Sequence, residues 1–164
     1  MPFSAEERAL RIDRYARGPA LLKEALDRVP EEARRWKPSP ERWSVHEIVC
    51  HCADSETNGA GHIRYLLAEE SPTVVGYDEA HWARALDYHA LPLDTAFQCV
   101  AAVRAHTAAL IRQVPGGAWS REGRHTESGP YKAEDWLRVY SEHLEKHAGQ
   151  IDRTYQAWQA EHKG

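Results

Sequence analysis

The 164-residue chain lacks the features that mark several large classes of protein. No apolar run approaches the roughly 18 residues of a membrane span, and no signal peptide opens the sequence. The net charge of −4 provides no basic field for the phosphates of a nucleic acid. We therefore expect neither a membrane protein nor a general nucleic-acid-binding protein.

Cysteine is scarce, with three residues and no Cys-x-x-Cys pair. An odd number of free thiols is typical of a reducing compartment, so we expect a cytoplasmic protein. Cys50 and Cys52 flank His51, but adjacent residues on a helix point about 100° apart, which favours packing over metal binding for both. We expect Cys99 to lie in the core.

The motifs of several enzyme classes are also missing. The sequence has no Gly-x-Ser-x-Gly motif, no phosphate-binding loop and no Gly-x-Gly-x-x-Gly. It also has no alternating run of apolar and polar residues, the pattern of a half-buried strand. We expect neither a serine hydrolase nor a nucleotide-dependent enzyme, and we expect no strands.

Helical periodicity runs through most of the chain, and its hydrophobic share of 42% suits a globular protein. The length suits one domain over residues 1–164. Four long helices are predicted over residues 4–29, 44–69, 94–114 and 132–160. A long connection with a short helix at 79–86 precedes the third, and an irregular loop over 118–130 precedes the fourth. This pattern indicates an all-α four-helix bundle.

Two capping boxes predict where helices begin: Ser4 with Glu7, and Ser44 with Glu47. Gly18-Pro19 interrupts the first helix, so we expect a kink or short break near Arg17. The inward face of this helix is expected to comprise Leu10, Tyr15, Leu22, Leu26 and Val29.

Histidine is abundant, with ten residues. His143 and His147 are four apart, which places both rings on one helical face about 6 Å apart along the axis. Two imidazoles so placed can converge on one metal ion. His51 lies on a polar face of the second helix and can supply a third ligand across the bundle. A three-histidine site leaves a position open for water or substrate, as in catalytic metal sites.

Chance alone can also explain the four-residue spacing of His143 and His147. Ten histidines in a chain of this length give roughly 0.6 pairs at i,i+4, so spacing alone favours satisfied or exposed histidines over a metal site. We expect His46 and His125 to be exposed. His62 lies about 16 Å along the helix from His51, too far to share an ion.

Other residues near the histidines have two readings each. Trp136 and Tyr140 precede His143 by two turns and one turn; a core position is favoured, with the lining of a pocket as the alternative. Glu47 or Asp54 is the candidate to orient a histidine or to act as a base.

Three segments resemble the DinB-like (DinB/YfiT) family of metal-binding four-helix bundles. They are 40–51 with a Trp-Ser-x-x-Glu-Ile-x-x-His pattern, 121–129, and 140–151 with His-x-x-x-His. The resemblance covers nearly the whole chain and is loosest over 71–92. It implies a divalent metal, zinc or nickel, held by three histidines, which correspond by position to His51, His143 and His147.

Members of that family include thiol transferases, a mycothiol-dependent isomerase and hydrolases. The resemblance therefore implies a metal-dependent enzyme acting on a small molecule, either a thiol-dependent S-transferase using a low-molecular-weight thiol or a hydrolase, and a homodimer. No residue selects among these activities. The alternatives are a non-catalytic metal-binding or stress-associated bundle, and a helical interaction module with incidental histidines.

Overall fold

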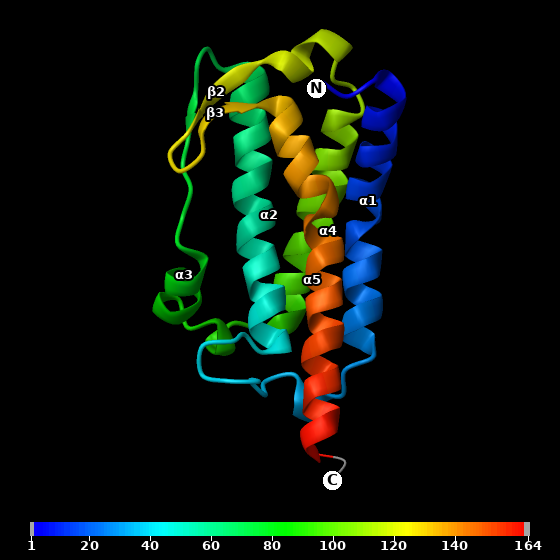
Figure 1. The fold of residues 1–164 in the computed structure, drawn as a ribbon, viewed down its shortest axis with the longest axis vertical. Coiled ribbons are helices and arrows are strands. Elements are labelled where there is room, and N and C mark those ends of the chain that lie inside the picture. The colour runs from blue at the N-terminus through cyan, green and yellow to red at the C-terminus, as the bar shows by residue number, and fades with distance from the viewer. Residues whose placement is uncertain (1, 163–164) are drawn as a thin grey trace.

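Four long helices form a bundle in the structure, a computed structural model that describes residues 2–162 (Figure 1). They are α1 (Ala5–Asp27), α2 (Val45–Ala68), α4 (Leu93–Ile111) and α5 (Ala133–His162). The connections contain a short helix, α3 (Glu79–Ala85), and the 3₁₀ helices η1 (Glu31–Ala33), η2 (Tyr88–Ala90) and η3 (Gly116–Ser120). The predicted all-α four-helix bundle is confirmed.

The long helices pack in an order that differs from their order in the chain. Helix α1 packs against α5 and α4, and α2 packs against α4 and α5. In Figure 1, α1 and α5 run down the bundle, whereas α2 and α4 run up it. Because α2 and α4 are parallel neighbours, no short turn can join them, and the chain returns along the bundle through α3.

Both predicted capping boxes are present. The Ser4 hydroxyl accepts a hydrogen bond from the Glu7 amide, and the Glu7 carboxylate accepts one from the Ser4 amide. Ser44 and Glu47 exchange the same pair of hydrogen bonds at the start of α2. These bonds satisfy backbone N–H groups that have no partner within the helix.

The expected break near Arg17 is wrong: α1 continues unbroken through Pro19. A proline lacks the N–H that would bond the carbonyl four residues earlier, here that of Tyr15. The Arg104 guanidinium donates to this carbonyl instead, with Nη1 at 2.7 Å from the oxygen. The missing helical bond is thereby replaced by one from α4.

One residue of the predicted inward face is also wrong. Leu10 is 64% exposed, whereas Tyr15, Leu22, Leu26 and Val29 are buried as expected. The buried stripe of α1 begins at Ile12, and Leu10 lies two residues before it, about 200° away around the helix.

A small sheet replaces part of the expected loop. Strands β2 (Glu122–His125) and β3 (Gly129–Lys132) form an antiparallel hairpin, and β1 (Thr73–Val74) pairs with β2 in parallel. The expectation of no strands is therefore wrong. Strands of two to four residues are too short to show alternation in the sequence. The sheet fastens the long connection after α2 to the hairpin before α5.

The apolar core consists of two buried clusters, one around Ile48 and Leu144 and the other around Ile63 and Trp136. Glu56 and Arg104 are buried between them along α2 and α4. Among the helices that the structure describes, none is both long and apolar enough to cross a membrane.

Candidate metal centre

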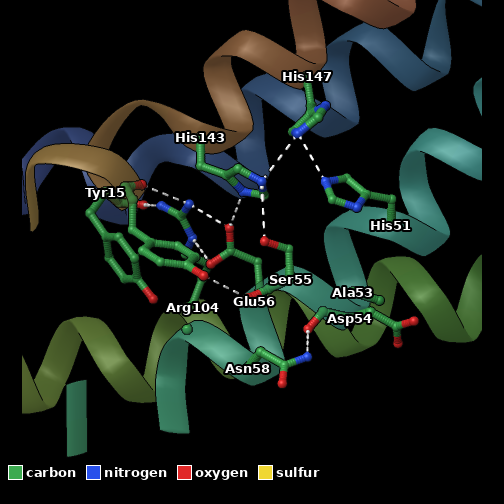
Figure 2. Close-up of polar contacts among 12 residues, drawn as sticks. Tyr15, His51, Ala53, Asp54, Ser55, Glu56, Asn58, Arg104, His143 and His147 are labelled. Atoms are coloured by element: carbon green, nitrogen blue, oxygen red, sulfur yellow. Dashed lines mark hydrogen bonds and ion pairs between the residues drawn. The ribbon is translucent and has the colours of Figure 1, made fainter. Parts of the chain in front are cut away.

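Three histidine rings converge between α2 and α5 (Figure 2). His51 comes from α2, and His143 and His147 come from α5, one turn apart. The Nε2 atom of His147 lies 3.2 Å from that of His51 and 3.1 Å from that of His143. One ligand atom from each residue lies within 4.8 Å of the others. The structure thus brings together the three histidines that the sequence singled out.

Hydrogen bonds fix the tautomers of the two α5 histidines. The Nδ1–H of His143 donates to Oε1 of Glu56 at 2.7 Å, and the Nδ1–H of His147 donates to the Gln150 side-chain oxygen at 2.8 Å. A neutral imidazole that donates from Nδ1 presents a lone pair at Nε2. When both rings are neutral, their two lone pairs face each other, an arrangement that suits a cation between them.

His51 is fully buried, and its ring packs against Trp43 with centroids 4.6 Å apart. Burial, with smaller contributions from His147 and His143, lowers its pKa to about 2. Burial, followed by the His143 charge, lowers the pKa of His147 to about 4. Both rings are therefore neutral near pH 7, the form that binds metal ions.

A buried ion pair between Arg104 and Glu56 supports His143 of the cluster. Nε and Nη2 of Arg104 donate to the two carboxylate oxygens of Glu56 at 2.6 and 2.7 Å, and neither side chain is more than 1% exposed. Burial alone would raise the pKa of Glu56. The Arg104 charge and the hydrogen bonds from His143 and Arg104 outweigh it and hold this pKa below its ordinary value. Glu56 is therefore a carboxylate acceptor for His143.

Arg104 is itself held from three helices. Its remaining hydrogen bonds reach the backbone oxygens of Tyr15 on α1 and Tyr140 on α5, at 2.7 and 2.9 Å. The guanidinium carbon also lies 3.8 Å from the centre of the Tyr15 ring. A site supported in this way has little freedom to shift.

Two further polar groups border the histidines, one buried and one half-exposed. Ser55 Oγ lies 3.3 Å from Nε2 of His143, and Oε2 of Glu79 lies 3.9 Å from Nε2 of His51. The Glu79 side chain is 53% exposed. Burial raises its pKa, although the His143 charge opposes the shift.

A groove of about 490 Å³ lies beside the cluster, bounded by α5, Ala80 of α3 and the connection before α2. Trp43, which packs on His51, and Gln150, which holds His147, form part of its wall. Arg42 and Arg153 line the same groove. The groove is large enough for a small organic molecule.

The family profile of the DinB superfamily matches residues 14–151. The chain belongs to the DinB superfamily. The family resemblance noted in the sequence is thereby confirmed.

This DinB superfamily chain has relatives in several Bacillus-like bacteria. It is 27% identical over 133 residues to a protein of Oceanobacillus iheyensis, a match that covers 81% of this chain and 77% of that protein. It is 29% identical over 156 residues to a protein of Bacillus licheniformis, covering 92% and 87%. Both relatives carry the name "putative metal-dependent hydrolase".

A solved structure shares the fold of this DinB superfamily chain. YfiT from Bacillus subtilis is described as "a probable metal-dependent hydrolase with an unusual four-helix bundle topology". The two structures align with a TM-score of 0.87 at 23% identity, over 95% of this chain and 90% of YfiT.

Several side chains of the DinB superfamily chain lie as the sequence predicted. Cys50 and Cys52 are buried packing residues, and burial raises the pKa of the Cys50 thiol to about 12. Trp136 is buried in the core, where its Nε1–H donates to the Gly59 carbonyl at 2.7 Å. Tyr140 is also buried, with its ring 5.6 Å from that of His143. Cys99 is only partly buried, at the margin of the core.

One prediction about a polar residue is wrong, and the two candidate carboxylates bond to groups outside the cluster. His46 is only 7% exposed, because η2 and the chain after it cover the first turn of α2; its Nε2 lies 2.9 Å from the Leu91 carbonyl oxygen. Glu47 pairs with Lys37 and caps α2. Asp54 accepts a hydrogen bond from the Tyr88 hydroxyl. Neither carboxylate is bonded to a histidine of the cluster.

Sequence reasoning missed the groups that orient the histidines. Gln150 follows His147 by three residues, and this helical spacing was a usable signal. Glu56 had no such signal, because its partners His143 and Arg104 lie 87 and 48 residues away in the chain.

Proposed function

We propose that this protein is a metal-dependent enzyme in which His51, His143 and His147 hold one divalent cation, zinc or nickel. The convergence of three Nε2 atoms, two of them in tautomers set by buried partners, carries this proposal. Neutral imidazoles suit either metal. Three protein ligands leave a coordination position for water or substrate.

Hydrolysis of a small molecule is the reaction that we infer first, and the names of the two bacterial relatives support it. A divalent cation in such a site lowers the pKa of a bound water or thiol and polarises a substrate carbonyl. The protein's own groups orient the site: Glu56 and Arg104 hold His143, and Gln150 holds His147.

Glu79 is the carboxylate placed to take a proton from the attacking nucleophile. Its Oε2 stands 3.9 Å from the His51 donor nitrogen, and its half-exposed position allows exchange of that proton with solvent. The Trp43 ring packs on the ring of His51 and so limits the access of water to it.

Thiol-dependent S-transfer is the second candidate. The groove beside the cluster favours it, because Arg42 and Arg153 can bind the acidic groups of a low-molecular-weight thiol. Gln150, which is bonded to His147, lines the same groove and connects it to the cluster. In this reaction the thiolate takes the place of water.

Elemental analysis of untagged protein tests the proposal. We expect about one zinc or nickel ion per chain in the wild type, and none in His51→Ala or His147→Ala. His106→Ala, an exposed position on α4, is the matched control and retains the metal. Wild-type protein that takes up no metal would overturn the proposal.

Turnover assays separate the candidate activities. Metal-loaded protein is offered p-nitrophenyl acetate for hydrolysis, and a small thiol with an alkyl halide for S-transfer. Bound metal with no turnover of either kind would favour a non-catalytic metal-binding protein.

A further inference from the structure

Tyr77 carries a hydroxyl group that no structural role explains. Its oxygen is buried, yet it has no hydrogen-bond partner among residues 2–162. Buried hydroxyl groups are nearly always paired, since an unpaired one is costly to keep from water. An exception of this kind calls for a specific reason.

The hydroxyl lies near residues that border the three-histidine cluster. Ser55, Glu79 and Tyr140 are among the groups around it. Each of these also borders the histidines: Ser55 Oγ is 3.3 Å from His143 Nε2, and Glu79 Oε2 is 3.9 Å from His51 Nε2. Tyr77 therefore shares its surroundings with two groups that border the histidines, the buried Ser55 and the half-exposed Glu79.

The segment that carries Tyr77 is held in place from both sides. Before it, the His62 Nε2–H donates to the Val75 carbonyl at 3.1 Å, and the Gly76 amide donates to Thr126 Oγ1 at 2.8 Å. After it, the Tyr77 ring packs on Trp82 with centroids 4.2 Å apart. The hydroxyl is thus positioned before any ligand arrives, which is what a catalytic donor requires.

The hydroxyl also keeps its proton over the physiological range. Burial, followed by the charge of Glu79, raises its pKa above the ordinary value. A protonated phenol is a hydrogen-bond donor, and within residues 2–162 no acceptor meets hydrogen-bond geometry with it, although Ser55 lies nearby.

We propose that the Tyr77 hydroxyl donates a hydrogen bond to the substrate oxygen that gains negative charge when an acyl compound is hydrolysed at the three-histidine site. This inference rests on the proposed function. It makes Tyr77 a catalytic residue, in contact with a reacting atom, and it names an acyl compound such as an ester or amide as the substrate class.

The hydrogen bond leaves the chemical balance unchanged. Water adds to the acyl carbon, and the carbonyl electron pair moves to the oxygen that Tyr77 contacts. The pair returns as the bond to the leaving group breaks, and the proton from water passes to the leaving group. Tyr77 keeps its proton and stabilises the charged oxygen, as an oxyanion-hole donor does.

The test compares Tyr77→Phe with Tyr65→Phe, a control that removes a hydroxyl from an exposed position on α2. Both variants are loaded with zinc, and acetate serves as the oxyanion in titration calorimetry. We expect acetate to bind Tyr77→Phe about 10-fold more weakly than it binds wild type or control. We expect kcat for p-nitrophenyl acetate to fall by about 10²–10³ in Tyr77→Phe, with KM little changed.

Zinc content and melting temperature distinguish this role from a structural one. Because the hydroxyl has no partner, its removal should leave the zinc content unchanged and the melting temperature equal or higher. A lower melting temperature for Tyr77→Phe, or equal acetate affinity in all three proteins, would overturn the inference while leaving the proposed function intact. Failure of the wild-type zinc protein to bind acetate would also overturn the inference and leave the proposed function intact. Wild type that binds no zinc would overturn both.

Discussion

Glu56 serves two partners at once, since it accepts a hydrogen bond from His143 and pairs with Arg104 inside the bundle. Replacement by Gln keeps the shape but removes the charge. We expect Glu56→Gln to weaken zinc affinity by about 10- to 100-fold, because His143 loses the anion that orients it. We also expect a loss of about 3–5 kcal/mol in the free energy of unfolding, because the Arg104 charge is left buried without a partner.

Competition with a chromophoric chelator measures the affinity, and urea unfolding measures the stability. The double variant Glu56→Gln/Arg104→Met removes the unpaired charge but also the donor to the Tyr15 and Tyr140 carbonyls, so it should recover only part of the stability and none of the zinc affinity. Unchanged zinc affinity in Glu56→Gln would show that His143 does not depend on the carboxylate.

The two histidines whose pKa values are strongly lowered, His51 and His147, predict how the metal-free protein responds to pH. In the folded protein the pKa of His51 is about 2 and that of His147 about 4, whereas both titrate near 6.5 when unfolded. As the pH falls below about 6.5, the unfolded chain binds protons that the folded chain does not. The free energy of unfolding should therefore fall, by as much as about 1.4 kcal/mol per pH unit for each histidine, until the pH approaches 4.

Urea unfolding in the presence of a chelator, at pH values from 7.5 to 5, measures this slope. His147→Gln removes one of the two groups and should give about half the wild-type slope. A profile that is flat over this range would contradict the lowered pKa values.

At the scale of the helix, two glycines of α2 differ in what surrounds them. A Cβ at Gly59 would overlap the ring of Tyr140, whereas a Cβ at Gly61 would meet nothing within 4 Å. We expect Gly59→Ala to destabilise the protein by about 1–3 kcal/mol through overpacking. Gly61→Ala should stabilise it by about 0.5–1 kcal/mol, since alanine favours a helix more than glycine does.

Urea unfolding of the two variants makes this comparison within one helix. Because Tyr140 also borders His143, Gly59→Ala should weaken zinc binding as well. Equal stabilisation by both alanines would show that Tyr140 moves aside without cost.

Features set by neighbours in the sequence were predictable at this scale. The capping boxes and the helical periodicity depend on residues within a few positions, and they located α1 and α2 closely. The effect of Pro19 on α1 was predicted wrongly because the donor to the Tyr15 carbonyl is a residue of α4, 89 residues away. The sheet was missed because its strands are too short to carry a pattern of their own.

The candidate site shows the same division across the whole molecule. His143 and His147 were predictable from their spacing on one helix. His51 required the additional assumption that α2 and α5 face each other, which the structure shows. The positions of Tyr77 and Glu79 near the site could not be predicted from the sequence, because the path of the connection between α2 and α4 depends on the packing of the assembled bundle. The homodimer and the cytoplasmic location stay predictions.

A metal bound by residues of two helices should stabilise the entire bundle. Zinc at about 1,000 times its dissociation constant adds about 4 kcal/mol to the free energy of unfolding. For a chain of this size that corresponds to a rise of roughly 8–16 °C in melting temperature. Thermal melting with zinc and with chelator measures the rise, and His51→Ala should show none of it. A wild-type melting temperature that is the same with zinc and with chelator would argue against a ligand set spanning α2 and α5.

The packing of α1 beside α5 has a consequence for how the protein is made. The two helices are separated by the whole of α2 and α4 in the chain, so α1 leaves the ribosome long before its main partner exists. At about 5–20 residues per second, the delay between the end of α1 and the end of α5 is roughly 7–27 s. During that time the buried stripe of α1, including Leu22 and Leu26, can pack against α4 once α4 has been made, but not against α5. The nascent chain thus carries an uncovered apolar helix face until α5 is complete, and a chaperone that binds such a face has its opportunity only in this interval.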